Sequence, residues 1–325
     1  MYFNSTKLML ANTMMIGVIM TICSNNWMSM WMGLEISLIS FIPLMQNNLN
    51  SSSESMIKYF IMQSVSSTMF LFSVTIMLIG VNMMEEFMLS LSMLIKLGST
   101  PFHNWIIMTI ENLSMMTMLN MLTILKIPPL MIMYQIESDW ILIPIMLGMI
   151  ISPIQCLNQS SIRKTLGFSS IFNISLTLLI IDKMLTMLMF MLIYSLNMIL
   201  LTMVFNSLKI KYFNQIMLNE SSNWNKINVW INLLSMGGFP PLMGFMNKIL
   251  VLQNLLMNSQ LTIMFIMLLS SMLVLMFYTR MAFSVIMMNS LFKKWMTINN
   301  SKYLYFQMTL NFTMTGMIMV ISMIN

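Results

Sequence analysis

Residues 228–257 read NVWINLLSMGGFPPLMGFMNKILVLQNLLM, an apolar run whose single charge is Lys248. A membrane-spanning helix needs about 20 predominantly apolar residues, so this run is long enough to cross a bilayer. Proline lacks an amide hydrogen and clashes with the preceding helical turn, so we predict a broken helix. Irregular backbone at membrane depth is tolerated only where it is buried in protein or lines a wet cavity. The residues predicted to break this helix are Gly237, Gly238, Pro240 and Pro241.

A second run, residues 84–107, has the same kind of interruption beside a lysine, in the sequence Lys96-Leu97-Gly98-Ser99-Thr100-Pro101. We predict that its helix breaks at Gly98 and Pro101. Interrupted spans at matching positions in two halves are expected of an inverted-repeat transporter, because an odd number of spans inverts the second copy. The alternative is a pair of packing kinks without a role in transport. The predicted organisation is one five-helix repeat over 1–136, a second over 137–290, and a loop with a final span over 291–325.

The composition of the whole chain is that of a multi-pass membrane protein. Charged residues make up 7% of 325 positions and apolar residues 58%, against roughly 25% charged residues in a soluble domain. The mean hydropathy is +0.83. We therefore predict an all-α transmembrane bundle of about eleven spans. Their expected positions are 4–23, 26–45, 56–80, 84–107, 113–134, 140–157, 164–181, 184–207, 228–257, 261–285 and 303–324.

The charges between these spans segregate by side. One side receives most of the basic residues, namely Lys7, Lys58, Arg163, Lys164, Lys209, Lys211, Lys226, Lys293, Lys294 and Lys302, together with the acids Glu54, Glu111 and Glu220. The other receives Glu85, Glu86, Glu137, Asp139 and Asp182, with Lys183 as its only base. By the positive-inside rule the N-terminus lies on the cytoplasm-equivalent side and the C-terminus opposite. In a mitochondrion these sides are the matrix and the intermembrane space.

Several functions are disfavoured by what the sequence lacks. The chain has two cysteines and one histidine, whereas iron–sulfur clusters and structural zinc sites normally take four such ligands. It contains neither a G-x-G-x-x-G nor a Walker motif, so no nucleotide site is indicated. Most of the basic residues behind the net charge of +6 lie in short loops, without a basic stripe interleaved with aromatics, so nucleic-acid binding is not expected. Any redox reaction should take place on other chains.

Four charged residues remain at membrane depth: Glu35, Lys96, Lys126 and Lys248. A charge at mid-bilayer costs at least ~2.5–3.5 kcal/mol, so charges without a function should be rare there. Burial disfavours the charged form of a lysine and a nearby carboxylate favours it, so such a lysine can take up and release protons. We predict a proton relay in which Glu35 acts on Lys96, and Lys126 and Lys248 pass the proton on. The alternative is that these lysines only satisfy carbonyls of the broken helices. His103 is either a relay member or a hydrogen-bonded structural side chain.

These residues also carry a family resemblance. The motifs, in chain order, are Trp31-Met32-Gly33-Leu34-Glu35, Ile57-Lys58-Tyr59-Phe60, Lys96-Leu97-Gly98 with Pro101-Phe102-His103 and Trp105, Leu157-Asn158-Gln159-Ser160 with Arg163-Lys164, Leu234 to Pro241 with Gly244-Phe245 and Lys248, and Phe277-Tyr278 with Arg280. Over about residues 25–290 the chain resembles the subunit-2 family of antiporter-like membrane-arm proteins of mitochondrial respiratory complex I, the NADH:ubiquinone oxidoreductase.

The resemblance implies a multi-pass subunit of the mitochondrial inner membrane that moves protons, driven by electron transfer elsewhere in the complex. It implies no cofactor in this chain, with flavin, iron–sulfur clusters and ubiquinone on partner subunits. The implied partners are other membrane-arm subunits and membrane lipids, and a homo-oligomer is not expected. Two rival functions stay open. One is a stand-alone cation/proton antiporter, and the other is a structural membrane subunit that moves no protons.

Overall fold

The computed structural model describes residues 5–46, 50–80, 85–136, 139–218, 223–287 and 306–313. Within these ranges the chain is helical, apart from turns and one isolated bridge between Ser161 and Tyr212. The predicted all-α class is therefore confirmed. The chain forms two compact units, Met1–Gly148 and Met149–Asn325. Whether the two predicted five-helix repeats are inverted copies of one another stays a prediction.

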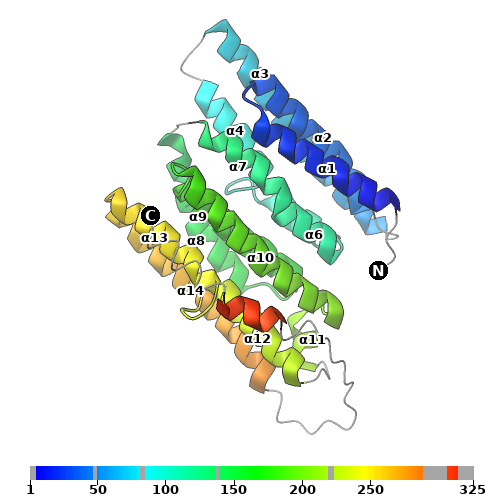
Figure 1. The fold of residues 1–325 in the computed structure, drawn as a ribbon, viewed down its shortest axis with the longest axis vertical. Helices are drawn as coiled ribbons and strands as arrows, with labels where there is room; N and C mark the ends of the chain where they lie inside the picture. The colour runs from blue at the N-terminus through cyan, green and yellow to red at the C-terminus, as the bar shows by residue number, and fades with distance from the viewer. Residues whose placement is uncertain are drawn as a thin grey trace. The chain divides into compact units, whose positions relative to one another are not determined.

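The first unit begins with three long helices and continues with shorter ones. The long helices are α1 (Ser5–Cys23), α2 (Trp27–Met45) and α3 (Asn50–Ile79); α2 packs against both α1 and α3, as Figure 1 shows in blue. The shorter elements are α4 (Glu85–Leu97), α5 (Asn104–Ile110), α6 (Met115–Leu122), the 3-10 turn η1 (Ile124–Lys126), α7 (Ile127–Tyr134), the 3-10 turn η2 (Asp139–Ile141) and the start of α8 (Leu142–Leu157).

The second unit holds the end of α8 and the remaining helices. These are α9 (Ile162–Leu179), α10 (Met184–Leu208), α11 (Phe213–Leu218), α12 (Asn223–Gly237), α13 (Gly244–Met257) and α14 (Leu261–Met287), followed by a helical segment at 306–313. Within this unit α12 packs against α10, α13 and α14.

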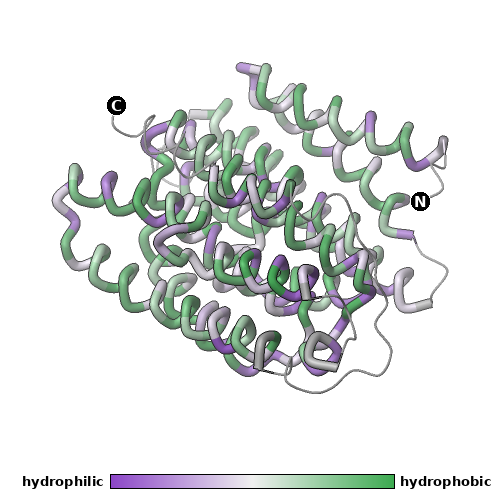
Figure 2. The backbone as a smooth tube through the Cα atoms, turned by 60° about the horizontal axis from the view of Figure 1, so that its bottom comes forward, coloured by the Kyte–Doolittle hydropathy of each residue, from purple (hydrophilic) through white to green (hydrophobic). Residues whose placement is uncertain are grey.

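Apolar surface faces outward in both units. Large hydrophobic side chains lie exposed along the helices, for example Met9, Leu78 and Met276 at 69%, 81% and 64%. Figure 2 shows hydrophobic residues along most of the length of the helices. A soluble protein would bury such side chains, so their exposure fits a chain whose solvent is lipid.

Serine and threonine side chains lie in the interior beside a large apolar core. Most of the buried ones donate to a backbone carbonyl three or four residues earlier on the same helix, as Ser37 does to Leu34 at 2.7 Å and Ser73 to Phe70 at 2.6 Å. This local hydrogen bond satisfies a hydroxyl without a partner from another helix. Polar residues in the apolar runs therefore do not interrupt the helices.

Two glycines bring α1 and α2 into backbone contact. A Cβ atom at Gly17 would lie 2.7 Å from the amide nitrogen of Ser37 and 2.8 Å from the carbonyl oxygen of Gly33. A Cβ atom at Gly33 would lie 2.6 Å from Cγ2 of Thr21. Small residues at a helix crossing allow this approach in a membrane, where packing rather than water release drives association. Glu35 lies on α2 two residues after Gly33, and is therefore close to this crossing.

Among the described residues, six helices are long and apolar enough to cross a membrane on their own. They correspond to the predicted spans at 4–23, 26–45, 56–80, 113–134, 184–207 and 261–285. The predicted spans 84–107 and 228–257 are each divided between two helices, α4 with α5 and α12 with α13. The last predicted span, 303–324, lies largely outside the described residues. The count of eleven therefore stays a prediction.

Candidate functional site

The first helix break lies between α4 and α5 and is built around a left-handed glycine. Gly98 has φ = +63°. Its amide donates to the carbonyl of Ile95 at 3.1 Å, and the amide of Ser99 donates to the carbonyl of Leu94 at 3.1 Å. These two bonds form a Schellman motif, which closes a helix and favours glycine at its left-handed position. Pro101 lies in the same break, where the chain is not helical.

Two side chains donate hydrogen bonds to backbone carbonyl groups in the last turn of α4. The indole Nε1 of Trp105 donates to the carbonyl of Ile95 at 3.1 Å. The amide Nε2 of Gln63, from α3, donates to the carbonyl of Lys96 at 3.4 Å. The last carbonyls of a helix have no partner within the helix and are costly to bury unpaired. Lys96 itself lies in the last turn of α4 and is 7% exposed, where the helix dipole favours a positive charge.

The second helix break repeats this geometry in the other unit. Gly238 has φ = +74°. Its amide donates to the backbone carbonyl of Ser235 at 3.0 Å, and the amide of Phe239 donates to the backbone carbonyl of Leu234 at 3.1 Å. Both breaks are therefore closed by the same Schellman motif. The residues predicted to break this span, Gly237, Gly238, Pro240 and Pro241, lie at the end of α12 or between α12 and α13.

Lys248 of α13 reaches back to this second break. Its Nζ donates to the carbonyl of Gly237 at 2.7 Å and lies 3.5 Å from the carbonyl of Ser271. A Cβ atom added at Gly238 would lie 2.5 Å from Cε and 2.8 Å from Nζ of Lys248. Glycine at 238 suits the left-handed backbone, and a larger residue there would displace the end of the Lys248 side chain.

Lys126 lies at a third interruption, inside the span predicted at 113–134. Helix α6 ends at Leu122, a 3-10 turn follows, and α7 begins at Ile127 with Pro128 in its first turn. Lys126 is 4% exposed, and its Nζ is buried without a hydrogen-bond partner in the described part of the chain. Burying an ammonium group costs free energy unless the group is hydrogen-bonded. The Lys126 side chain therefore needs either a water molecule as a partner or a neutral amine.

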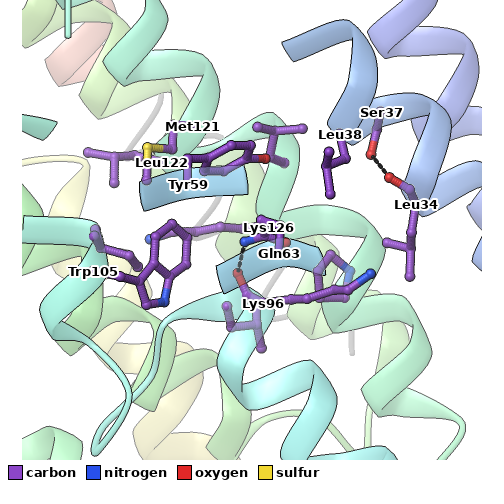
Figure 3. A pocket seen from close by; sticks show the side chains of 14 residues that line it. Leu34, Ser37, Leu38, Tyr59, Gln63, Lys96, Trp105, Met121, Leu122 and Lys126 are labelled. Carbon is purple, nitrogen blue, oxygen red and sulfur yellow. Dashed lines mark hydrogen bonds between the residues drawn. The ribbon is translucent and has the colours of Figure 1, made fainter. Parts of the chain in front are cut away.

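One cavity brings Lys96 and Lys126 together. Its volume is about 30 Å³, and Figure 3 shows the side chains around it. Both lysines line it, and Tyr59 and Gln63 contribute polar groups from α3. The full lining is Leu34, Ser37, Leu38, Tyr59, Gln63, Lys96, Leu97, Trp105, Ile106, Met121, Leu122, Leu125, Lys126 and Pro129.

Glu35 is near this cavity but does not line it. It is partly buried on α2, and its Oε1 has no hydrogen-bond partner in the ranges that the structure describes. Its negative charge acts electrostatically on both Lys96 and Tyr59. The arrangement lets the carboxylate influence the cavity lysine through its field.

His103 lies at the start of α5 and is 7% exposed. Its Nδ1 is 3.2 Å from the carbonyl oxygen of Pro101, and it is absent from the lining of the cavity. A short contact to the backbone of the break fits the structural interpretation of this histidine better than a place between Lys96 and Lys126.

Tyr59 and Gln63 are not among the site residues predicted from the sequence, although Tyr59 belongs to one of the quoted motifs. The available signal was two hydrogen-bonding side chains four residues apart in an apolar run. Lys226 is predicted to lie in a loop, whereas this lysine is 2% exposed in the first turn of α12. That assignment is wrong because α12 begins earlier than the span predicted from residue 228.

A chain of buried amides in the second unit was also not anticipated. Asn228 donates to Gln307, Asn232 donates to Asn228 at 3.1 Å, and Asn311 donates to Asn232 at 2.6 Å. These bonds join α12 to the helical segment 306–313. Each of the four residues is at most 7% exposed, so the amides pair with one another where water is excluded.

Comparisons with known proteins agree with this architecture. A family model described as "NADH:quinone oxidoreductase/Mrp antiporter, TM" matches residues 24–274. NADH-ubiquinone oxidoreductase chain 2 of Anopheles gambiae is 38% identical over 323 residues, which cover 95% of this chain and 94% of the relative.

Two solved structures share the fold at low sequence identity. One is a chain of respiratory complex I from Thermus thermophilus, with a TM-score of 0.81 at 17% identity over 94% of this chain and 75% of that one. The other belongs to an Mrp complex from Dietzia, with a TM-score of 0.71 at 13% identity over 87% of this chain and 60% of that one. The resemblance drawn from the motifs is thus confirmed. The chain belongs to the NADH:quinone oxidoreductase/Mrp antiporter family, as an antiporter-like membrane subunit of complex I of the chain 2 type.

Proposed function

We propose that this chain translocates protons through Glu35, Lys96, Lys126 and Lys248, driven by electron transfer in partner subunits. The observation that carries the proposal is the cavity shared by Lys96 and Lys126, with the Lys126 ammonium buried and unpaired on one side of it. A lysine held only to satisfy backbone carbonyls would be hydrogen-bonded to them, as Lys248 is to Gly237. Lys126 has no such bond to any residue in the described ranges.

The first unit supplies the parts of a switchable proton site. A change in the position of the Glu35 charge would alter the proton affinity of Lys96, because a nearby carboxylate stabilises the ammonium form. A proton released from Lys96 then has Lys126 as its acceptor across the cavity. Lys96 lies at the C-terminal end of α4, where the helix dipole stabilises the lysine while it is protonated.

The second unit supplies the last proposed relay member. Lys248 is partly buried and bound to the end of α12. Because its partner is a neutral carbonyl rather than a carboxylate, Lys248 can lose its proton without leaving an unpaired negative charge behind. His103 is the weakest candidate, since it does not line the cavity that Lys96 and Lys126 share.

The proposed setting is the mitochondrial inner membrane, with the N-terminus in the matrix and the C-terminus in the intermembrane space. The segregation of loop charges supports this orientation. Flavin, iron–sulfur clusters and the ubiquinone site are proposed to lie on partner subunits, because two cysteines and one histidine offer too few ligands for a cluster. The proposed partners are other membrane-arm subunits and lipids, and the chain acts as one copy within the complex.

Assembly is tested by native-gel separation of gently solubilised membranes, with an NADH-dehydrogenase activity stain and mass spectrometry of this chain. Co-migration with the large active band is the expected result. Recovery only as a small species, under detergent that keeps the active band whole, would instead identify a stand-alone antiporter.

The proton relay is tested by Lys126→Met in the assembled complex, reconstituted in vesicles. Methionine keeps the length and apolar part of the side chain but carries no proton. We expect loss of proton pumping and of coupled NADH:ubiquinone turnover, with normal amounts of complex. Lys183→Met is the matched control, because Lys183 precedes α10 in an inter-helix turn. Full pumping by Lys126→Met would leave a structural subunit as the remaining interpretation.

A further inference from the structure

The cavity between Lys96 and Lys126 has one wall that the proposed relay does not use. Tyr59 and Gln63 both come from α3 and line the cavity. They are four residues apart, so they lie on one face of the helix. Tyr59 is 4% and Gln63 7% exposed. Figure 3 shows both among the side chains that surround the space next to the lysines.

Aromatic neighbours hold the ring of Tyr59 in place. Phe41 packs against it edge-on, with ring centroids 5.3 Å apart, and Trp105 lies tilted at 5.9 Å. No hydrogen bond joins the Tyr59 hydroxyl to another side chain or backbone group in the described ranges. A buried hydroxyl without a partner costs about 1–3 kcal/mol, so a cavity-facing hydroxyl is satisfied most readily by water.

Gln63 has one hydrogen-bonding group in use and one available. Its Nε2 donates to the carbonyl of Lys96 at 3.4 Å, which anchors the side chain at the end of α4. The amide oxygen can still accept a hydrogen bond. The carbonyl group at the helix break therefore fixes the orientation of the amide beside the cavity.

The size of the cavity sets how many water molecules it can take. One water needs about 10–15 Å³, so a cavity of about 30 Å³ has room for about two. Two waters also need polar partners, and the lining offers the two lysines, the Tyr59 hydroxyl and the Gln63 amide. The remaining lining is mostly apolar, which confines the water to this group of side chains.

We propose that Tyr59 is a proton-conducting residue and Gln63 a positioning residue, which together with about two waters connect Lys96 to Lys126. This inference rests on the proposed function. The Lys96 ammonium gives a proton to the first water, which passes one to the Tyr59 oxygen. The Tyr59 hydroxyl hydrogen moves to the second water, which protonates the Lys126 amine. One proton crosses, and Tyr59 ends neutral. The Gln63 amide keeps its hydrogens and orients the waters.

The test is Tyr59→Phe in the assembled complex, which removes the hydroxyl and keeps the ring between Phe41 and Trp105. We expect proton pumping and coupled turnover to fall by about two- to ten-fold, because this is the change in rate that corresponds to the free energy of one ordinary hydrogen bond. The solvent deuterium isotope effect on turnover should rise, because proton transfer then limits the rate. Gln63→Leu should lower turnover in the same direction.

Tyr134→Phe is the matched control, because Tyr134 is 38% exposed at the end of α7 and outside the cavity lining. It should leave turnover and isotope effect unchanged. Tyr59→Phe with wild-type turnover and isotope effect would overturn the inference. So would a lower amount of complex with unchanged turnover per complex, which assigns Tyr59 to packing alone.

Lys126→Met in the same assay separates this inference from the proposed function. If Lys126→Met abolishes pumping while Tyr59→Phe does not alter it, the relay stands and only the role of Tyr59 is overturned. If Lys126→Met pumps normally, the proposed function fails, and the inference fails with it.

Discussion

Lys248 and Gly237 are joined by a hydrogen bond of 2.7 Å from the lysine Nζ to the glycine carbonyl oxygen, across the break between α12 and α13. The carbonyl belongs to the end of α12, where the helix leaves it without a partner. The lysine therefore closes the break and is held by it. A change to either side of this contact should affect both the position and the proton affinity of Lys248.

Gly238→Ala should disturb this contact directly. The new Cβ atom would lie 2.5 Å from Cε of Lys248 and would occupy a left-handed backbone position. We expect a several-fold loss of coupled turnover, because the lysine must move away from Gly237. Turnover and proton pumping of the reconstituted complex measure it. Gly80→Ala is the control, since Gly80 has φ = +86° but nothing within 4 Å of its Cβ position. Equal effects of the two substitutions would mean that backbone strain alone is responsible.

Trp105→Phe should destabilise the first break. It removes the donor to the carbonyl of Ile95 while keeping an aromatic ring beside Tyr59. The Ile95 carbonyl keeps its bond from the Gly98 amide at 3.1 Å, so the expected cost is that of one hydrogen bond, about 0.5–1.5 kcal/mol, and faster amide hydrogen exchange in α4 and α5 would report it. Trp140→Phe serves as control because Trp140 is 62% exposed. Unchanged exchange in Trp105→Phe would show that the hydrogen bond contributes little to closing α4.

Gly33→Val should separate α1 from α2. The Cβ position lies 2.6 Å from Cγ2 of Thr21 and 2.9 Å from the carbonyl oxygen of Gly17, so a branched side chain cannot fit without moving the helices apart. We expect a lower yield of assembled complex on native gels. Met32→Val changes the neighbouring residue, which is 49% exposed, and should leave the yield unaffected. A normal yield for Gly33→Val would show that the close crossing is dispensable.

Asn232→Leu should weaken the attachment of segment 306–313 to α12. Asn232 is the central amide, bonded to both Asn228 and Asn311, and its loss leaves two buried groups without a partner. The expected cost is about 1–3 kcal/mol for each unsatisfied group, seen as faster hydrogen exchange in 306–313. The double variant Asn232→Leu/Asn311→Leu should recover part of this cost, because it removes one of the unpaired groups. Strict additivity of the two substitutions would argue against a shared network.

The sequence predicted the all-α membrane fold because hydropathy acts over each span separately. It also placed the glycines and prolines that lie between α4 and α5 and between α12 and α13, since backbone restrictions are local. The third interruption, at Lys126, was less visible because Pro128 equally suits the first turn of a helix. Tyr59 and Gln63 could not be chosen from sequence alone. Their role depends on how α3 packs against the end of α4, which involves residues far apart along the chain.

A helix with unbroken backbone hydrogen bonds moves as one rigid element, so a rotation at one end also turns the other end. The break after Gly98 removes that stiffness in the span that carries Lys96. Across the break, the side-chain link described above is the bond from Trp105 to Ile95, whose net free energy is about 0.5–1.5 kcal/mol. That is only about one to three times the thermal energy. Within this span, α5 is therefore held in place mainly by its packing against α3 and not by continuity with α4.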